Sequence, residues 1–341
     1  MNADFDRSGR RQKTCACPPG QCECFKRDKK IKVDIISGFL GAGKTTLMNN
    51  LLSQEKGELD VLVREYGEAA IDDKLLKGVP EERLHVFFGV SMHDHPQLLL
   101  HDYLHRIAAE DTEGKMTHLL IETSGLDYPE DIVELFMVGY IPMSYELGSF
   151  TAVADAQFGN LTLDEYRVAV EQAAYADRIV VNKTDLASAA EVGKLCKRLR
   201  EINGVARIII TDHGRVEADK LMGGSLYGQL KDLKKTEGSK AMDGITTLVI
   251  SEQRPLDKEK VNAWIDALYQ THGDEILRGK GFLDFAGEDY RYEFQSVRRA
   301  FHSASGKKWR LGEERKSTLV FIGRDSLISL NLQQGLSACA V

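Results

Sequence analysis

Residues 38–46, Gly-Phe-Leu-Gly-Ala-Gly-Lys-Thr-Thr, combine three glycines with a lysine and two hydroxyl side chains. Glycines in such a loop let successive backbone N–H groups turn toward a phosphate, which a Cβ would obstruct. Lys44 then supplies a mobile cation for the β- and γ-phosphates of a nucleotide, and Thr45 supplies a hydroxyl for Mg²⁺. The residues expected to contact phosphate or Mg²⁺ are Gly38, Gly41, Ala42, Gly43, Lys44, Thr45 and Thr46.

The segments around this loop have the composition of the elements that must hold it. Residues 31–37 form an apolar run typical of a buried strand, and residues 47–52 are typical of the start of a helix. Strand, glycine loop and helix, in this order, are the context in which G-x-x-x-x-G-K-[ST] indicates phosphate binding. The helix N-terminus adds positive partial charge. The sequence therefore predicts that the protein binds a nucleoside triphosphate.

A second strand, predicted over residues 116–121, ends in Glu122-Thr-Ser-Gly125. A carboxylate and then a glycine at a strand end are expected on the phosphate side of such a domain. We expect Glu122 to hold Mg²⁺ directly or through water, and the Gly125 N–H to meet the γ-phosphate.

A strand predicted over residues 59–64 leads into a segment that contains several carboxylates. We expect Glu65, Glu68 or Asp72 to couple the γ-phosphate to the surface that a metal or a client protein contacts. The alternative is an acidic surface loop with no such role. The candidate catalytic residues are Lys44, Thr45, Glu65, Glu68 and Glu122.

The base is predicted from Asn182-Lys-Thr-Asp185, which follows a strand expected over residues 178–181. Asp185 can accept from the N1–H and exocyclic amine of guanine, a pattern that adenine does not offer. Asn182 would fix the loop, and the stem of Lys183 would pack over the base. The predicted nucleotide is GTP rather than ATP, and residues 211–215 are expected to line the base.

The overall composition excludes several classes of protein. The net charge is −7, and no large basic stripe is present, so nucleic acid is not an expected partner. The basic residues near the N-terminus fit a solvated tail better than a nucleic-acid arm. No secretory signal is present, and no apolar run approaches the roughly 20 residues needed to cross a bilayer. We therefore expect a cytoplasmic protein without a membrane partner.

Four of the six cysteines lie within ten residues of the N-terminal tail. In a reducing compartment such a cluster is better interpreted as metal ligands than as disulfides. The spacing C-x-C-x4-C-x-C allows the thiols to converge on one tetrahedral ion. The alternative is a flexible tail that binds metal only adventitiously. The thiols are those of Cys15, Cys17, Cys22 and Cys24.

The order of predicted elements indicates an α/β fold with a second, smaller domain. Strands alternate with helices, including one expected over residues 163–176, which predicts a mainly parallel sheet covered on both faces, as in P-loop NTPases. After a charged linker near residues 231–240 come strands expected around 276–286, 290–302 and 317–323, which predict a small α+β domain with a mostly antiparallel sheet. The expected units are a tail over 1–29, a nucleotide domain over 30–232 and a C-terminal domain over 241–341.

Together with Leu319-Val-Phe-Ile-Gly-Arg324, these motifs resemble the CobW-type P-loop GTPases, which are related to the nickel accessory GTPases of urease and hydrogenase. Residues 64–68, Arg-Glu-Tyr-Gly-Glu, are similar to the family's Asn-Glu-Phe-Gly-Glu segment, with Arg64 in place of Asn. The resemblance covers roughly residues 31 to 341. It implies slow hydrolysis of GTP to GDP and phosphate, a C-terminal CobW domain, and GTP-gated transfer of Zn, Co or Ni to a client enzyme.

The sequence departs from this family where the family carries its metal motif, Gly-Cys-x-Cys-Cys. The aligned residues are Gly89-Val-Ser-Met-His93, without a cysteine. One substitute is the tail cysteine cluster. The other is His93 and His95 together with His101 and His105, because imidazole suits Ni, Co or Zn. Histidines that are simply solvated, or satisfied within the core, remain the alternative for the second group.

Three functions follow from these features. The first is a GTP-hydrolysing metallochaperone, or a factor that inserts a metal cofactor into a client metalloenzyme. The second is a GTP-dependent protein chaperone that protects or reactivates a cobalamin enzyme without carrying metal, which the missing cysteines favour. The third, nucleotide binding without turnover, is disfavoured because Lys44 and Thr45 are both present. No arginine finger is evident, so a client or a homodimer partner is expected to complete the site.

Overall fold

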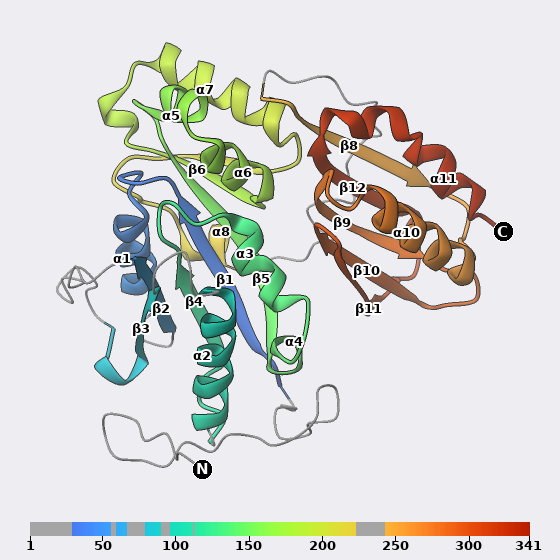
Figure 1. Ribbon diagram of the computed structural model, residues 1–341, viewed down its shortest axis with the longest axis horizontal. Coiled ribbons are helices and arrows are strands. Elements are labelled where there is room, and N and C mark those ends of the chain that lie inside the picture. Colours follow the sequence, from blue (N-terminus) through green and yellow to red (C-terminus); the bar gives the residue numbers. More distant parts are fainter. Residues whose placement is uncertain (1–28, 56–58, 67–78, 90–95, 112, 223–242) are drawn as a thin grey trace.

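The computed structural model describes residues 29–341 apart from 56–58, 67–78, 90–95, 112 and 223–242. Within these residues the chain forms two sheets that lie side by side, each with its own helices (Figure 1). The predicted tail, except Lys29, and the predicted linker over residues 231–240 lie outside the described residues.

The first sheet has seven strands in the order β3-β2-β4-β1-β5-β6-β7, and every neighbouring pair is parallel. This confirms the predicted parallel sheet, whose strands are apolar because helices cover both faces. The strands are β1 (Ile31–Gly38), β2 (Asp60–Tyr66), β3 (Leu84–Gly89), β4 (His118–Glu122), β5 (Tyr145–Asp155), β6 (Arg178–Asn182) and β7 (Arg207–Ile210).

Helices cover the two faces of this sheet unequally. One face packs against apolar side chains of six helices. They are α2 (Pro96–Glu110), α3 (Pro129–Val133), α4 (Ile141–Ser144), α5 (Gly159–Glu165), α6 (Arg167–Tyr175) and α7 (Ala189–Ile202). The other face packs against α1 (Lys44–Gln54) and α8 (Ala218–Leu221). Successive residues of β1, such as Ile35 and Ile36, therefore point to opposite faces and enter different cores.

The second sheet is antiparallel, with the order β11-β10-β9-β12-β8. Its strands are β8 (Ile245–Glu252), β9 (Ile276–Asp284), β10 (Tyr290–Val297), β11 (Ala300–Lys308) and β12 (Ser317–Arg324). One face packs against α10 (Lys258–His272) and α11 (Leu332–Ala338). The other face contributes Leu277, Phe282 and Val320 to the core that also contains α6. The two domains therefore share an apolar core.

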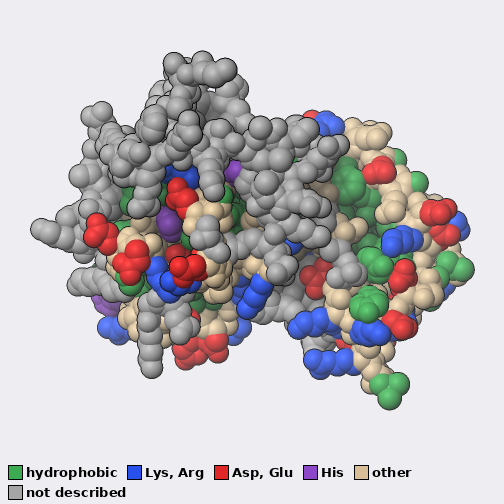
Figure 2. Space-filling view, turned by 90° about the horizontal axis from the view of Figure 1, so that it is seen from below, with side chains coloured by type: hydrophobic (Ala, Val, Ile, Leu, Met, Phe, Trp, Pro, Cys, Tyr) green, Lys and Arg blue, Asp and Glu red, His purple; other side chains and the backbone are tan. Residues whose placement is uncertain are grey.

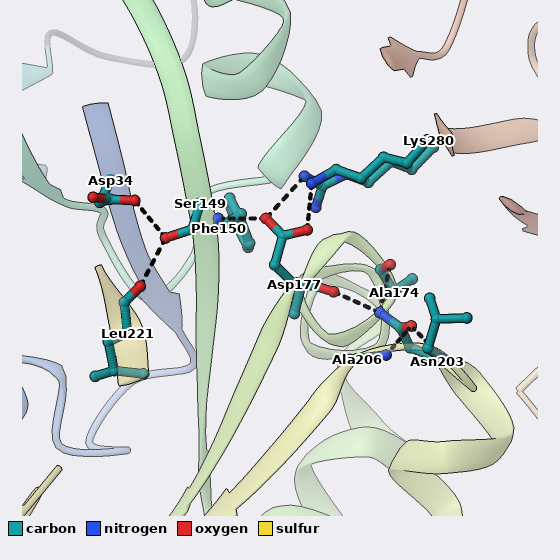
Figure 3. Close-up of polar contacts among 12 residues, drawn as sticks. Asp34, Ser149, Phe150, Ala174, Asp177, Asn203, Ala206, Leu221 and Lys280 are labelled. Carbon is teal, nitrogen blue, oxygen red and sulfur yellow. Dashed lines mark hydrogen bonds and ion pairs between the residues drawn. The ribbon is translucent and has the colours of Figure 1, made fainter. Parts of the chain in front are cut away.

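Figure 3 shows two buried polar contacts that support this arrangement. Asp177, just before β6, accepts from the Phe150 N–H of β5 at 2.8 Å and pairs with Lys280 and Arg278 of β9 across the domain junction. On the opposite side of β5, the Ser149 hydroxyl lies between Asp34 of β1 and the Leu221 carbonyl of α8.

The single helix predicted over residues 163–176 is wrong. The chain forms α5 and α6, which are separated at Tyr166, where φ is −125° and ψ is 107°. The Tyr166 ring contacts the Phe39 ring at a centroid distance of 4.4 Å, so a tertiary contact accompanies the break. A separate helix, α6, therefore begins at Arg167.

The single strand predicted over residues 290–302 is also wrong. The chain forms a hairpin in which Val297 pairs with Ala300, and Arg298 occupies the turn with φ of 48°. Hairpin turns of this kind usually contain Gly, Asn or Asp, and two arginines gave no such signal. Two 3₁₀ segments adjoin the short helices: one (Glu134–Phe136) follows the five-residue α3, and another (Asp325–Leu330) precedes α11.

On the face drawn in Figure 2, acidic and basic side chains are intermixed over the described residues. Among the helices that the structure describes, none is long and apolar enough to cross a membrane.

Candidate nucleotide-binding site

Four parallel strands end side by side at one edge of the first sheet. In spatial order β4, β1, β5 and β6 end at Glu122, Gly38, Asp155 and Asn182. Ligands of open α/β sheets bind at the carboxyl ends of strands, because the loops that follow the strands converge there. The three motifs predicted from the sequence therefore meet at this edge.

The phosphate loop, residues 38–44, joins β1 to the first residue of α1. Gly43 has φ of 101°, and a Cβ at this position would collide with the side-chain amide of Asn182, so glycine is required. The Lys44 ammonium donates to the carbonyl oxygens of Gly38 at 2.8 Å and Phe39 at 3.3 Å. It is thereby held against the loop, where phosphate oxygens can replace these carbonyls as its partners.

The two residues predicted for Mg²⁺ are in direct contact. The Thr45 hydroxyl donates to Glu122 Oε1 at 2.8 Å. Glu122 is buried at the end of β4, between β1 and β2. A hydroxyl and a carboxylate are oxygen ligands of the kind that Mg²⁺ prefers. Thr46, predicted for a phosphate, is exposed in the first turn of α1.

The segment after β4, residues 123–127, is called here the γ-phosphate loop. Its Thr123 hydroxyl donates to the Ser37 hydroxyl of β1 at 2.9 Å. A Cβ on Gly125 would lie 2.6 Å from the backbone nitrogen of Leu40, in the phosphate loop. The absence of a side chain at Gly125 therefore lets the two loops touch.

Asp127 holds the same loop closed from within. Its Oδ2 accepts from the Ser124 N–H at 2.9 Å and lies 3.5 Å from the guanidinium of Arg64. Both Asp127 and Arg64 are buried. Arg64, the residue that departs from the family's Asn, thus connects the end of β2 to the γ-phosphate loop.

Asn182 joins the phosphate loop to the loop expected to hold the base. Its Nδ2 donates to the Ala42 carbonyl at 3.1 Å, and its Oδ1 accepts from the Gly214 N–H at 2.8 Å. The side chain is buried. The prediction that Asn182 fixes a loop therefore corresponds to contacts with two loops, one on each side.

Lys183 and Asp185 lie at the outer end of the same loop. Lys183 has φ of 60°, and its ammonium pairs with Asp155 Oδ2 at 2.8 Å. Asp185 is partly exposed, and its Oδ2 lies 3.8 Å from His213 Nε2. His213 belongs to the segment that was expected to line the base. An exposed acceptor beside a tethered lysine has the chemistry to bind guanine.

Several predicted residues cannot be placed. Glu68, Asp72, the four tail cysteines, His93 and His95 lie outside the described residues. Glu65 belongs to β2, but its side chain is not described. Burial, and then the nearby charge of His101 one helical turn away, lower the pKa of His105. Within the described part of the chain, no group of three or more His, Cys, Asp or Glu side chains is arranged to hold a metal.

Two residues at this edge were missed by the sequence analysis. Asp155 tethers Lys183 and is fixed by the N–H groups of Gln157 and Phe158. Its position at the end of β5 was a usable signal, because the other site residues also follow strand ends. Gln172, buried in α6, donates to carbonyls of the γ-phosphate loop.

The fold and this edge define a P-loop nucleotide-binding protein with a C-terminal antiparallel-sheet domain. Residues 32–210 match the CobW/HypB/UreG nucleotide-binding domain, and residues 245–340 match the cobalamin synthesis protein CobW C-terminal domain. The chain belongs to the CobW/HypB/UreG family.

Comparison with individual proteins gives the same assignment. The chain is 30% identical to the zinc chaperone YjiA of Escherichia coli over 303 residues, covering 86% of this chain and 94% of that protein. It is 27% identical to the zinc chaperone CobW of Pseudomonas aeruginosa, covering 87% and 88%. The crystal structure of Zn(II)-bound YjiA GTPase from E. coli superposes with a TM-score of 0.65 at 27% identity, covering 92% of this chain and 100% of that one.

Proposed function

We propose that this protein binds and hydrolyses GTP and uses that cycle to deliver a metal ion to a client metalloenzyme. The observation that carries the nucleotide half is the contact of Thr45 with Glu122 beside Lys44. These groups supply two oxygen ligands for Mg²⁺ and one cation for phosphate at the end of a glycine loop. The contact of Asn182 with the phosphate loop supports the choice of guanine, because it ties that loop to Asp185.

The residues at the edge fit a nucleotide and Mg²⁺ by their chemistry. Lys44, the loop amides and Thr46 would hold the phosphates, Thr45 and Glu122 would hold Mg²⁺, and Asp185 would accept from the base. Mg²⁺ bound there neutralises charge that develops on the transferring phosphoryl group. The protein contributes positioning: Gly125 lies against Leu40, so its N–H is held near the γ-phosphate position.

The cargo proposed is zinc, with cobalt and nickel as the other candidates. The names of the E. coli and P. aeruginosa relatives, zinc chaperones, support zinc. A third relative, the zinc-regulated GTPase metalloprotein activator 1 of Dictyostelium discoideum, supports a client metalloprotein as partner. We propose the tail cysteines, Cys15 to Cys24, as the metal ligands, with His93 and His95 as the second candidate set. The alternative function, a GTP-dependent protein chaperone that carries no metal, is favoured only by the absence of cysteine from residues 89–93.

Comparison of the parent with Lys44→Ala tests this function. We expect Lys44→Ala to lower the rate of GTP hydrolysis by at least about 100-fold, because charge stabilisation of the phosphoryl group is lost. Release of phosphate is measured with GTP and ATP, and only GTP should be turned over efficiently. Equal rates for the parent and Lys44→Ala would exclude the proposed hydrolysis.

The metal is measured on the same preparations by mass spectrometry. Serine at the four tail cysteines should remove bound zinc, while alanine at His93 and His95 should leave it. The reverse result would move the site to the histidines, and unchanged metal in both variants would exclude both proposed sites.

A further inference from the structure

Helix α6 lies between the two domains and contacts both. It packs against α3 of the first domain and against β9 and β12 of the second. All residues from Val168 to Tyr175 are buried. In Figure 1, α6 lies on the side of the first domain that faces the second. Because the surrounding apolar core is continuous across the junction, a displacement of the second domain would be transmitted to this helix.

Gln172 connects α6 to the γ-phosphate loop. Its Nε2 donates to the carbonyl oxygens of Gly125 and Asp127, both at 3.2 Å. The side chain is 2% exposed, so these bonds are made away from water. One amide thus fixes the Gly125 and Asp127 carbonyl groups. Both follow the Gly125 N–H, which we propose meets the γ-phosphate.

Arg298 connects the second domain to the same region. It occupies the turn between β10 and β11, donates to the Asp274 carbonyl at 2.8 Å, and pairs with Glu130. Glu130 lies on α3, which begins directly after the γ-phosphate loop. The guanidinium also lies 3.9 Å from Glu171, the residue before Gln172 on α6. A single side chain of the second domain therefore reaches both elements that flank the loop.

The junction contains a polar atom without a hydrogen bond. The Tyr175 hydroxyl of α6 is buried and makes none among the described residues. Buried polar groups without hydrogen bonds are rare, and each needs an explanation. A cavity of about 300 Å³, lined by Leu40, Phe158 and Gln172 among others, adjoins α6 behind the phosphate loop. A cavity along α6 and a buried hydroxyl without a hydrogen bond on the same helix favour a second arrangement of α6.

We propose that Gln172 is a positioning residue for the γ-phosphate loop. Arg298 links α6, the helix that carries Gln172, to the C-terminal domain. Through these contacts the C-terminal domain sets the rate of GTP hydrolysis. This inference rests on the proposed function. Neither residue is among those proposed to contact the nucleotide. Both act through the position of Gly125, which is needed for a triphosphate but not for a diphosphate.

The test compares Arg298→Ala with Arg299→Ala. Arg299 is the neighbouring residue of the same turn, and it pairs with Asp274 within the second domain. We expect Arg298→Ala to lower the single-turnover rate of GTP hydrolysis about 3- to 30-fold. Its affinity for a fluorescent GDP should stay within about twofold of the parent. Arg299→Ala should match the parent in both measurements.

Two further variants sharpen the result. Gln172→Met keeps the shape but cannot donate, and should lower the hydrolysis rate about tenfold while leaving GDP affinity unchanged. Glu130→Arg combined with Arg298→Glu should recover the rate that each single variant loses. Thermal unfolding of every variant shows whether it is folded, and if Gln172→Met is not, the partly exposed Arg298 carries the test.

Each outcome decides between the proposals. Parent-like hydrolysis in Arg298→Ala would overturn the link, and equal losses of GDP affinity and rate would reduce both residues to structural supports. If the parent itself is no faster than Lys44→Ala, the proposed function and the inference both fall. A fast parent with an unaffected Arg298→Ala overturns the inference alone.

Discussion

The phosphate loop and the domain junction both contain buried charged groups, but their partners differ. Lys44 rests on the carbonyl oxygens of Gly38 and Phe39, which carry no net charge and which a ligand can replace. Asp177 is enclosed by Lys280 and the Phe150 N–H (Figure 3). Arg278 also pairs with it, and all three partners are part of the fold. Lys44 can therefore exchange its partners for those of a ligand, whereas Asp177 keeps the same partners as long as the protein is folded.

The difference separates binding from stability. Burial alone would raise the pKa of Asp177, but the charges of Arg278 and Lys280 outweigh it and hold the pKa at about 2. A carboxylate with this pKa is charged at every physiological pH, so it contributes to cohesion rather than to a proton transfer. Changes at Asp177 should therefore alter unfolding, and changes at Lys44 should alter nucleotide chemistry.

The largest expected effect is that of Asp177→Ala on stability. Removing the carboxylate leaves two buried cations without their counterion, which costs about 3–5 kcal/mol of unfolding free energy. Urea unfolding measures the loss. Asp274→Ala is the control, because Asp274 pairs with Arg299 at the surface, and such pairs contribute little.

The same Asp177→Ala protein should bind GDP with the affinity of the parent at a temperature where it is folded. A nucleotide affinity that falls together with stability would show that the two regions are not separable. A stability equal to that of Asp274→Ala would show that the junction does not hold the domains together.

The pH dependence of unfolding should reveal the same carboxylate. Its folded pKa of about 2 lies below the value of about 3.9 expected in the unfolded chain. The stabilisation is therefore fully present above about pH 4 and is lost as the pH falls toward 2, a change of about 2–3 kcal/mol. The pKa of Asp34 is also lowered. Burial would raise it, but the hydrogen bonds to His118 and Ser149 outweigh burial, so Asp34 adds a loss of stability of the same sign.

Unfolding free energies measured between pH 6 and pH 2.5 test this prediction. Asp177→Asn should flatten the decline, because the titrating group is gone. A decline of equal steepness in both proteins would assign acid sensitivity to other carboxylates.

The smallest expected effect lies at the base end of the nucleotide edge. Asp155→Asn weakens the tether of Lys183, and we expect about a fivefold loss of GTP affinity, equivalent to about 1 kcal/mol. Titration with a fluorescent GTP analogue measures it, with Asp164→Asn, an exposed residue of α5 that pairs with Arg198, as the control. Equal affinities for the two variants would remove Asp155 from the site.

The motifs at strand ends could be predicted because their spacing carries the chemistry. Glycine, lysine and carboxylate at fixed positions identified the phosphate loop and Glu122. The alternation of predicted strands with predicted helices indicated the parallel sheet. The structure brings Lys44, Thr45, Glu122 and Asn182 to one edge, as their positions after strands implied.

The elements that connect the domains could not be predicted, because their signals are tertiary. The break at Tyr166 coincides with a contact to Phe39, and the turn at Arg298 has no residue that favours a positive φ. Gln172 acquires its meaning only when the γ-phosphate loop lies against α6. Local patterns specify what a segment prefers, and these features depend on what the segment meets.

The continuous core across the junction has a consequence for how the chain can be divided. Leu277, Phe282 and Val320 of the second sheet pack into the core that surrounds α6. A fragment ending before residue 243 would lack these side chains and would expose to water the apolar side of α6 that they cover. Exposed apolar patches of this kind promote association. The two domains are separate in sequence and in sheet topology, yet each buries apolar side chains of the other. We expect them to fold as one cooperative unit, so that a relative missing the second domain must have rebuilt the outer side of α6 with polar residues.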